Sequence, residues 1–266
     1  MLLKHLGVVL GGAVLLSAAL VLWAGKALRS SVASEPAFAL ARAPFYSVGK
    51  LPACLEPGVW KTLHKGCVAP LPARALDSDA ATLLGRALEK SPWVREVRSV
   101  DVDATPKVRV DLVFREPVAT VPWGGSLGYV DQEGVLLPRG HYRLTSLALP
   151  RIVGIRKGPP AAAGQLWADP GLKSGLAVLQ GLPAGNPATA LDLIDVTNVG
   201  ELKPGLPEVV CRTRRGIRLH FSVSGKPGRP TLEEQMGRLG EVLKVDRDLT
   251  LPRQYVELRF GRPVGS

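Results

Sequence analysis

The longest stretch without a charged side chain lies near the start of the sequence, at residues 6–24, LGVVLGGAVLLSAALVLWA. About 20 apolar residues, rising about 1.5 Å each in a helix, cross the hydrocarbon core of a bilayer. Trp23 stands at the end of the stretch, where an indole ring prefers the membrane interface, and Lys26 follows it. We therefore expect a single transmembrane helix over 6–24, preceded by a short cytoplasmic tail at 1–5 and followed by a tether at 25–42.

A cleaved signal peptide is the alternative interpretation of this stretch. The apolar region of a signal peptide is usually only about 7–15 residues long, so the length favours a retained anchor. Lys4 precedes the stretch, whereas Lys26 and Arg29 follow it. Because basic residues flank both ends, the positive-inside rule does not decide the orientation.

Beyond the tether, the hydrophobic pattern predicts a strand, two helices and two strands in succession. The strand at 45–48 is followed by a short helix at 56–63, and then by a helix capped near Asp79 with an apolar face. Ser91-Pro92 ends that second helix. The last two strands are expected at 93–100 and 108–114, where apolar and polar residues alternate. Packing both helices on one face of a three-stranded sheet is the simplest way to bury these apolar faces, which predicts an α+β domain at 43–116.

After Pro117 the pattern becomes richer in strands and turns, and it predicts a mixed β-rich domain with helices at 117–266. Thr231 and Glu234 have the spacing of a capping box at the start of a helix over 232–245. A second helix is expected at 172–182. Strands and hairpins are expected at 129–137, 147–153, 191–196, 209–221 and 255–260.

Composition narrows the function classes. The 266 residues carry 34 Lys and Arg against 23 Asp and Glu, a net charge of +11, and 46% are hydrophobic, which excludes a wholly disordered chain. Three cysteines are too few for a four-cysteine zinc or iron–sulfur site or for a disulfide-dense scaffold. The four histidines are scattered. We therefore expect no metal site and no cofactor.

The sequence offers few candidates for catalysis or anion binding. Gly124–Gly128 fits the G-x-S-x-G pattern around Ser126, but a hairpin follows where a nucleophile needs a helix, so a flexible loop is favoured over a hydrolase. No catalytic constellation is present, which predicts a protein that is not an enzyme and has no small-molecule substrate. The basic cluster Arg212, Arg214, Arg215 and Arg218 lacks interleaved aromatic residues, which disfavours nucleic acid. Anionic lipid headgroups and a solvated hairpin tip remain open.

The cysteines leave two possibilities. Cys54 and Cys67 close a 14-residue loop, so they are compatible with a disulfide in an exported domain and equally with two partly buried thiols. Cys211 lies among apolar neighbours and is expected in the core.

Several short motifs occur in a distinctive order. A helix ends at Ser91-Pro92-Trp93-Val94, a turn contains Pro106, and the next strand leaves through Arg115-Glu116-Pro117-Val118-Ala119. Tyr129-Val130-Asp131-x-x-Gly134-Val135 and Leu149-Pro150-x-Ile152-x-Gly154 follow, and the last is Tyr255-Val256-Glu257-Leu258-Arg259-Phe260. Behind a single N-terminal anchor, this order resembles the FtsQ/DivIB family of cell-division proteins over residues 43–266.

The resemblance implies a POTRA domain at 43–116 and a C-terminal β domain at 117–266, both on the extracytoplasmic or periplasmic side of the cytoplasmic (inner) membrane. It implies a non-enzymatic, single-pass scaffold at the division site, with FtsB/FtsL-like single-pass coiled-coil proteins as partners. The alternative is a POTRA-type envelope assembly chaperone that binds polypeptide strands.

The resemblance also implies a binding site, because the family's last strand is an edge to which a partner segment adds by β-augmentation. The partner-binding residues expected on this basis are Tyr255, Val256, Glu257, Leu258, Arg259, Phe260 and, just beyond the strand, Arg262. Phe260 is the expected anchor. The competing interpretation is that Val256, Leu258 and Phe260 all face the core, since alternation places them on one side of the strand.

Overall fold

The computed structural model describes residues 20–27, 31, 39–40, 45–71, 79–103, 107–143, 148–183, 190–249 and 254–260. Within these ranges, no helix has both the length and the apolar character that a membrane span requires. Of the expected transmembrane helix, residues 20–24 are described and helical, while 6–19 and the tail 1–5 lie outside the described residues.

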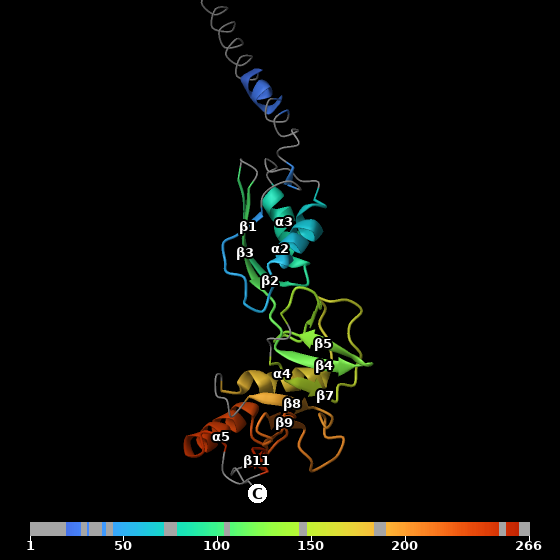
Figure 1. Ribbon diagram of the computed structural model, residues 1–266, viewed down its shortest axis with the longest axis vertical. Coiled ribbons are helices and arrows are strands. Elements are labelled where there is room, and N and C mark those ends of the chain that lie inside the picture. The colour runs from blue at the N-terminus through green and yellow to red at the C-terminus, as the bar shows by residue number, and fades with distance from the viewer. Residues whose placement is uncertain are drawn as a thin grey trace, which may run out of the picture. The chain divides into compact units, whose positions relative to one another are not determined.

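The chain forms two compact units (Figure 1). The first contains Gly58–Ser91 and Glu96–Val113 together with the described residues up to Lys50. The second contains Phe114 onward, and Leu51–Pro57 and Pro92–Arg95 cluster with it although they come earlier in the sequence. Both units combine helices with a sheet, so the predicted α+β class is confirmed.

The first unit holds a three-stranded sheet with two helices on one side of it (Figure 1). Its elements are β1 (Phe45–Ser47), α2 (Gly58–Leu63), α3 (Ala80–Glu89), β2 (Val94–Val102) and β3 (Val108–Phe114). A π-helical turn at His64–Val68 extends α2. The central strand is β3, which pairs in parallel with β1 and has β2 on its other side.

The alternation of apolar and polar residues explains which face of this small sheet packs against the helices. Val108, Val110 and Leu112 of β3 are buried on one face, and Leu84 and Leu88 of α3 are fully buried. These apolar residues recur every second position in the strand and every fourth in the helix, as a shared core requires.

The second unit is built on an eight-stranded mixed sheet with the order β11-β10-β9-β8-β7-β4-β5-β6. Its strands are β4 (Ala119–Trp123), β5 (Ser126–Val130), β6 (Leu136–Leu137), β7 (Arg151–Val153), β8 (Leu191–Asp195), β9 (Val209–Thr213), β10 (Arg218–Phe221) and β11 (Tyr255–Glu257). Its helices are α4 (Pro170–Gly181) and α5 (Leu232–Val245).

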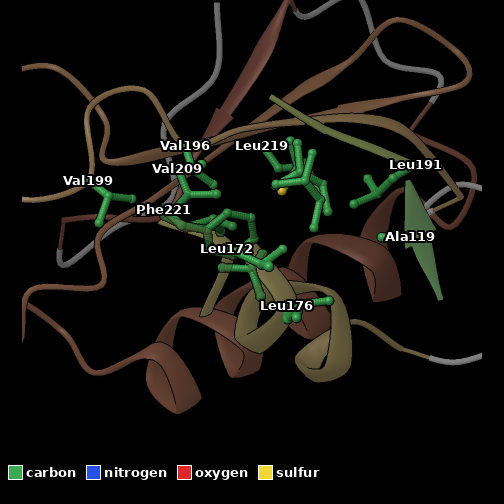
Figure 2. Close-up of a cluster of buried hydrophobic side chains, with 14 of the residues drawn as sticks. Ala119, Leu172, Leu176, Leu191, Val196, Val199, Val209, Leu219 and Phe221 are labelled. Carbon is green, nitrogen blue, oxygen red and sulfur yellow. The ribbon is translucent and has the colours of Figure 1, made fainter. Parts of the chain in front are cut away.

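One registered row of side chains forms the centre of this core. Ile152, Ile194, Cys211, Leu219 and Val256 stand opposite one another on five successive strands, and all five are at most 1% exposed. Leu172 and Leu176 of α4 belong to the same cluster, as Figure 2 shows, and so does Leu239 of α5. The two helices therefore cover one face of the sheet, and the residues on either side of the row belong to the other face.

The turn after β7 is fixed by a buried carboxylate. Asp169 is 3% exposed and caps α4 by accepting a hydrogen bond from the backbone N–H of Leu172, 3.0 Å away. Its other oxygen accepts from the backbone N–H groups of Arg156 and Lys157, at 3.0 and 2.9 Å. Burial works to raise the pKa of Asp169, but these backbone hydrogen bonds hold it below its ordinary value.

Gly154, between β7 and this turn, touches the chain that follows β8. It has a φ of 87°, which L side chains rarely adopt, and a Cβ here would lie 2.4 Å from the backbone nitrogen of Thr197. The close approach of two backbone segments thus requires glycine at this position.

Several predicted elements are confirmed in detail. The helix 232–245 has the predicted bounds and the complete Thr231–Glu234 capping box. Cys211 is fully buried in the core, as expected, and Cys54 and Cys67 are free thiols whose pKa is raised by burial.

Two predictions are wrong. The glycines of the G-x-S-x-G pattern do not form a flexible loop, because Gly124 and Gly125 make a tight turn between β4 and β5 with positive φ at both residues. The hydroxyl of Ser126 donates to the Trp123 carbonyl across this turn, at 3.1 Å. The last strand ends at Glu257 and does not reach Phe260, because the N–H of Arg259 bonds to the Glu257 carboxylate.

Candidate functional site

Among the residues that the structure describes, the eight-stranded sheet has one covered edge and one open edge. At the covered edge, the backbone of Leu136 in β6 donates to Gln165 at 2.9 Å and accepts from Gly164 at 2.7 Å. Val135 and Leu166 form a further bridge. The segment 164–167 therefore occupies the side of β6 where another strand would add.

At the opposite edge, β11 pairs in parallel with β10 and with no other described strand. The Gln254 carbonyl and the Leu258 N–H bond to β10, each at 3.2 Å. Because such bonds alternate along a strand, Val256 also faces β10, while the backbone groups of Tyr255 and Glu257 point away from it. These two residues offer two N–H and two C=O groups to an incoming strand, and no described residue takes them.

The side chains of β11 are held in place from both faces. Val256 and Leu258 are at most 1% exposed and belong to the core, as the competing interpretation expected. On the other face, Glu257 and Arg259 are each 7% exposed. Burial of these four side chains means that the strand can offer its backbone to a partner, but not these side chains.

Glu257 and Arg259 form a bidentate ion pair at the end of the strand, which we call the clamp. The guanidinium Nε and Nη2 donate to the two carboxylate oxygens of Glu257 at 2.8 and 2.7 Å, and Nη1 donates to the Gly205 carbonyl at 2.9 Å. His220 of β10 lies 3.3 Å from the same carboxylate. Burial works to raise the pKa of Glu257, but the hydrogen bonds from Arg259 and His220 lower it to about 2.

The clamp explains why β11 stops at Glu257. The N–H of Arg259, which would be the next group to face the open edge, instead donates to the Glu257 carboxylate at 3.1 Å. Arg238 of α5 donates to the carbonyls of Leu258 and Phe260. The Arg259 N–H and the Leu258 and Phe260 carbonyls are therefore already bonded within the chain.

Phe260 consequently does not follow the alternation of side chains between the two faces of the strand. It is 52% exposed, unlike Val256 and Leu258, so the predicted common face of these three residues is wrong. The guanidinium carbon of Arg259 lies 5.0 Å from the centre of its ring, in cation–π geometry. Arg262 lies outside the described residues.

The structure brings Tyr255, Glu257, Arg259 and Phe260 together with two residues that the sequence did not single out. His220 stacks on Tyr255 with ring centres 4.9 Å apart, and Arg238 reaches the strand from α5. His220 had a detectable signal, since it lies in a predicted strand with alternating polarity. Arg238 had none, because its contact spans 20 residues and depends on where α5 docks.

The clamp gives a prediction for stability. We expect Glu257→Gln to lower the free energy of unfolding by about 2 kcal/mol at pH 7, because the amide keeps one acceptor but loses the charge that Arg259 meets. Since the pKa of Glu257 is lowered, its contribution is present above the ordinary glutamate value and disappears as the pH falls towards about 2. Denaturant titrations of the full chain between pH 7 and pH 3 check both points. A difference between wild type and variant that stays constant over this range would contradict them.

Comparisons with known proteins add little to this geometry. No protein-family model matches the chain, and no curated protein matches it. Among solved structures, the chain is similar to the major extracytoplasmic domain of the trans isomer of the bacterial cell division protein DivIB from Geobacillus stearothermophilus, with 18% sequence identity. The similarity covers 51% of this chain and 98% of that chain, with a TM-score of 0.29, which is too low to establish a common fold.

Proposed function

We propose that this chain is a non-enzymatic scaffold of the bacterial cell-division machinery, anchored in the cytoplasmic membrane by 6–24 with its two units on the extracytoplasmic side. It recruits FtsB/FtsL-like single-pass coiled-coil proteins, one of which adds a strand to β11. The proposal starts from the FtsQ/DivIB resemblance over residues 43–266. The strand, two helices and two strands of the first unit have the order that a POTRA domain implies.

The open edge at β11 is the observation that carries the proposal. A strand at the edge of a sheet presents unpaired backbone groups that another chain can bond, and proteins usually block such edges. In this sheet the β6 edge is blocked by 164–167, whereas at β11 the groups of Tyr255 and Glu257 face outward. The exposed ring of Phe260 stands directly beyond them and supplies an apolar contact at the end of the strip.

The backbone role of β11 can be tested at Tyr255 by comparing two substitutions. Tyr255→Pro removes an outward N–H but leaves the bonds to β10, whereas Tyr255→Ala removes the side chain and keeps the N–H. The tagged full chain would be used to recover proteins from a detergent extract of native membranes, with identification by mass spectrometry. We expect Tyr255→Pro and Phe260→Arg to reduce recovery of coiled-coil division proteins by about tenfold or more, and Tyr255→Ala to have a much smaller effect.

The other outcomes of this experiment are equally informative. Equal recovery of partners by the wild type and the three variants would place the partner site away from β11. Recovery of many unrelated unfolded polypeptides, abolished by Tyr255→Pro, would favour the envelope assembly chaperone, which uses the same edge for transient clients. Circular dichroism of each variant would show that its fold is retained.

A further inference from the structure

The face of the large sheet opposite α4 and α5 carries a second registered row of side chains. The pairings align Arg151 of β7, Leu193 of β8, Arg212 of β9, Arg218 of β10 and Tyr255 of β11. These residues alternate with the buried row that begins at Ile152, so they project from the face on which neither α4 nor α5 lies. We call it the uncovered face, although Glu257 and Arg259 at its β11 end are buried. We call Arg151, Arg212 and Arg218 the arginine row.

The arginine row is exposed and has an excess of positive charge. All three arginines are exposed, and Arg212 makes a bidentate pair with Asp192, whose side chain is 38% exposed. That pair lowers the pKa of Asp192, with a further contribution from the charge of Arg151. One carboxylate thus serves two guanidinium groups, and Arg218 forms no ion pair with any residue that the structure describes.

The neighbouring hairpin tip does not belong to this surface. Arg214 donates to the Ala148 carbonyl at 2.6 Å, and Arg215 donates to the Asp248 carbonyl at 2.6 Å. Of the four arginines that cluster in the sequence, two are therefore used to fasten the hairpin, and only Arg212 and Arg218 remain in the row.

The surroundings of the row restrict what it can bind. The next registered row on the same face contains Asp195 of β8, which is partly exposed, so a carboxylate borders the arginines on one side. A broad anionic surface such as a bilayer, or the continuous phosphates of a nucleic acid, would meet this carboxylate as well. A narrow acidic segment that runs across the strands would meet only the arginines.

The spacing of the row fits a polypeptide in helical form. Neighbouring strands lie about 4.8 Å apart, so Arg212 and Arg218 stand about 10 and 14 Å from Arg151. On a helix rising about 1.5 Å per residue, carboxylates at positions i, i+7 and i+11 lie on one face at about 10 and 16 Å from the first. Arginine side chains are long enough to absorb the remaining difference.

We infer that the arginine row is a docking surface for an acidic polypeptide segment that crosses β7 to β10 on the uncovered face. Charge complementarity identifies the partner, and the row ends at Tyr255, beside the open edge. The inference goes beyond the proposed function and does not depend on strand addition at β11, because none of the three arginines contributes a backbone group to that edge.

A designed peptide tests the inference directly. The probe is a labelled alanine- and glutamine-based helical peptide of about 20 residues with glutamates at i, i+7 and i+11. Its binding to the full chain in neutral detergent is followed by fluorescence anisotropy at low salt. We expect R151E/R218E to weaken binding by about tenfold or more, since two attractions become repulsions. The control K173E/R247E, which reverses two exposed charges outside the uncovered face, should bind as wild type does.

The control ligands make the result decisive. A peptide of identical composition with its glutamates spread around the helix should bind wild type more weakly. Equal binding of the two peptides, or equal binding by wild type and R151E/R218E, would overturn the inference. The inference would also be overturned if the peptide did not bind, while oligothymidine or mixed micelles containing phosphatidylglycerol bound the wild type and lost binding to R151E/R218E. Tyr255→Pro should leave peptide binding unchanged, so a failure of the strand-addition proposal would be seen separately.

Discussion

Replacing Gly154 by alanine is expected to lower the free energy of unfolding of the second unit by about 4 kcal/mol. Two effects combine at this residue. A φ of 87° is unfavourable for any residue with a Cβ, and the added methyl group would lie 2.4 Å from the backbone nitrogen and the hydroxyl oxygen of Thr197. The hydroxyl could rotate away, but the nitrogen and Cα of Thr197 are backbone, so the clash can be relieved only by separating the chain after β7 from the chain after β8.

Gly216→Ala is the matched control for this prediction. Gly216 also has a φ of 87°, but nothing lies within 4 Å of the position where its Cβ would be. It should therefore show only the conformational cost, about 1 kcal/mol. Denaturant titrations followed by the fluorescence of Trp123 and Trp167, which both lie in the second unit, measure both changes. Similar losses in the two variants would contradict the role assigned to the backbone contact.

Asp169→Ala is expected to cost about 3–4 kcal/mol, because three backbone N–H groups near α4 lose their acceptor at once. The groups belong to Leu172, Arg156 and Lys157, and the carboxylate that they share is almost fully buried. Thr231→Ala, which removes the cap of α5 at an exposed position, should cost only about 1 kcal/mol. Equal losses for the two cap substitutions would show that the bonds to Arg156 and Lys157 contribute nothing.

The Asp169 carboxylate also predicts how the free energy of unfolding changes with pH. Because the pKa of Asp169 is lowered in the folded chain, its stabilising effect is complete above the ordinary aspartate value and is lost as the pH falls through the folded value. The difference in unfolding free energy between wild type and Asp169→Ala should therefore shrink on acidification. Titrations at pH 7 and pH 3 measure this change, and a constant difference would contradict it.

Local signals in the sequence predicted local structure well. The Thr231–Glu234 capping box predicted both side-chain hydrogen bonds at the start of α5, since the two residues are only three positions apart. The apolar neighbours of Cys211 predicted its burial, and the Val130-Asp131-x-x-Gly134 motif predicted the hairpin between β5 and β6. In each case the signal in the sequence lies within a few residues of the feature that it predicts.

The features that the sequence did not predict depend on distant partners. The parallel pairing of β10 with β11 joins residues 37 positions apart in the chain, such as His220 and Glu257. The early end of β11 follows from a carboxylate that captures the Arg259 N–H, which alternation alone does not reveal. The arginine row required the register of four strands, because Arg151 is remote in sequence from Arg212 and Arg218.

The unequal edges of the large sheet also limit how copies of this chain can polymerise. Fibre growth by strand pairing needs two open edges on each molecule, so that every added copy offers a new edge to the next. Among the described residues, the β6 edge is occupied by 164–167 and only β11 is open. Two copies that join through β11 would use up both open edges of their large sheets, so growth through this sheet stops at a pair.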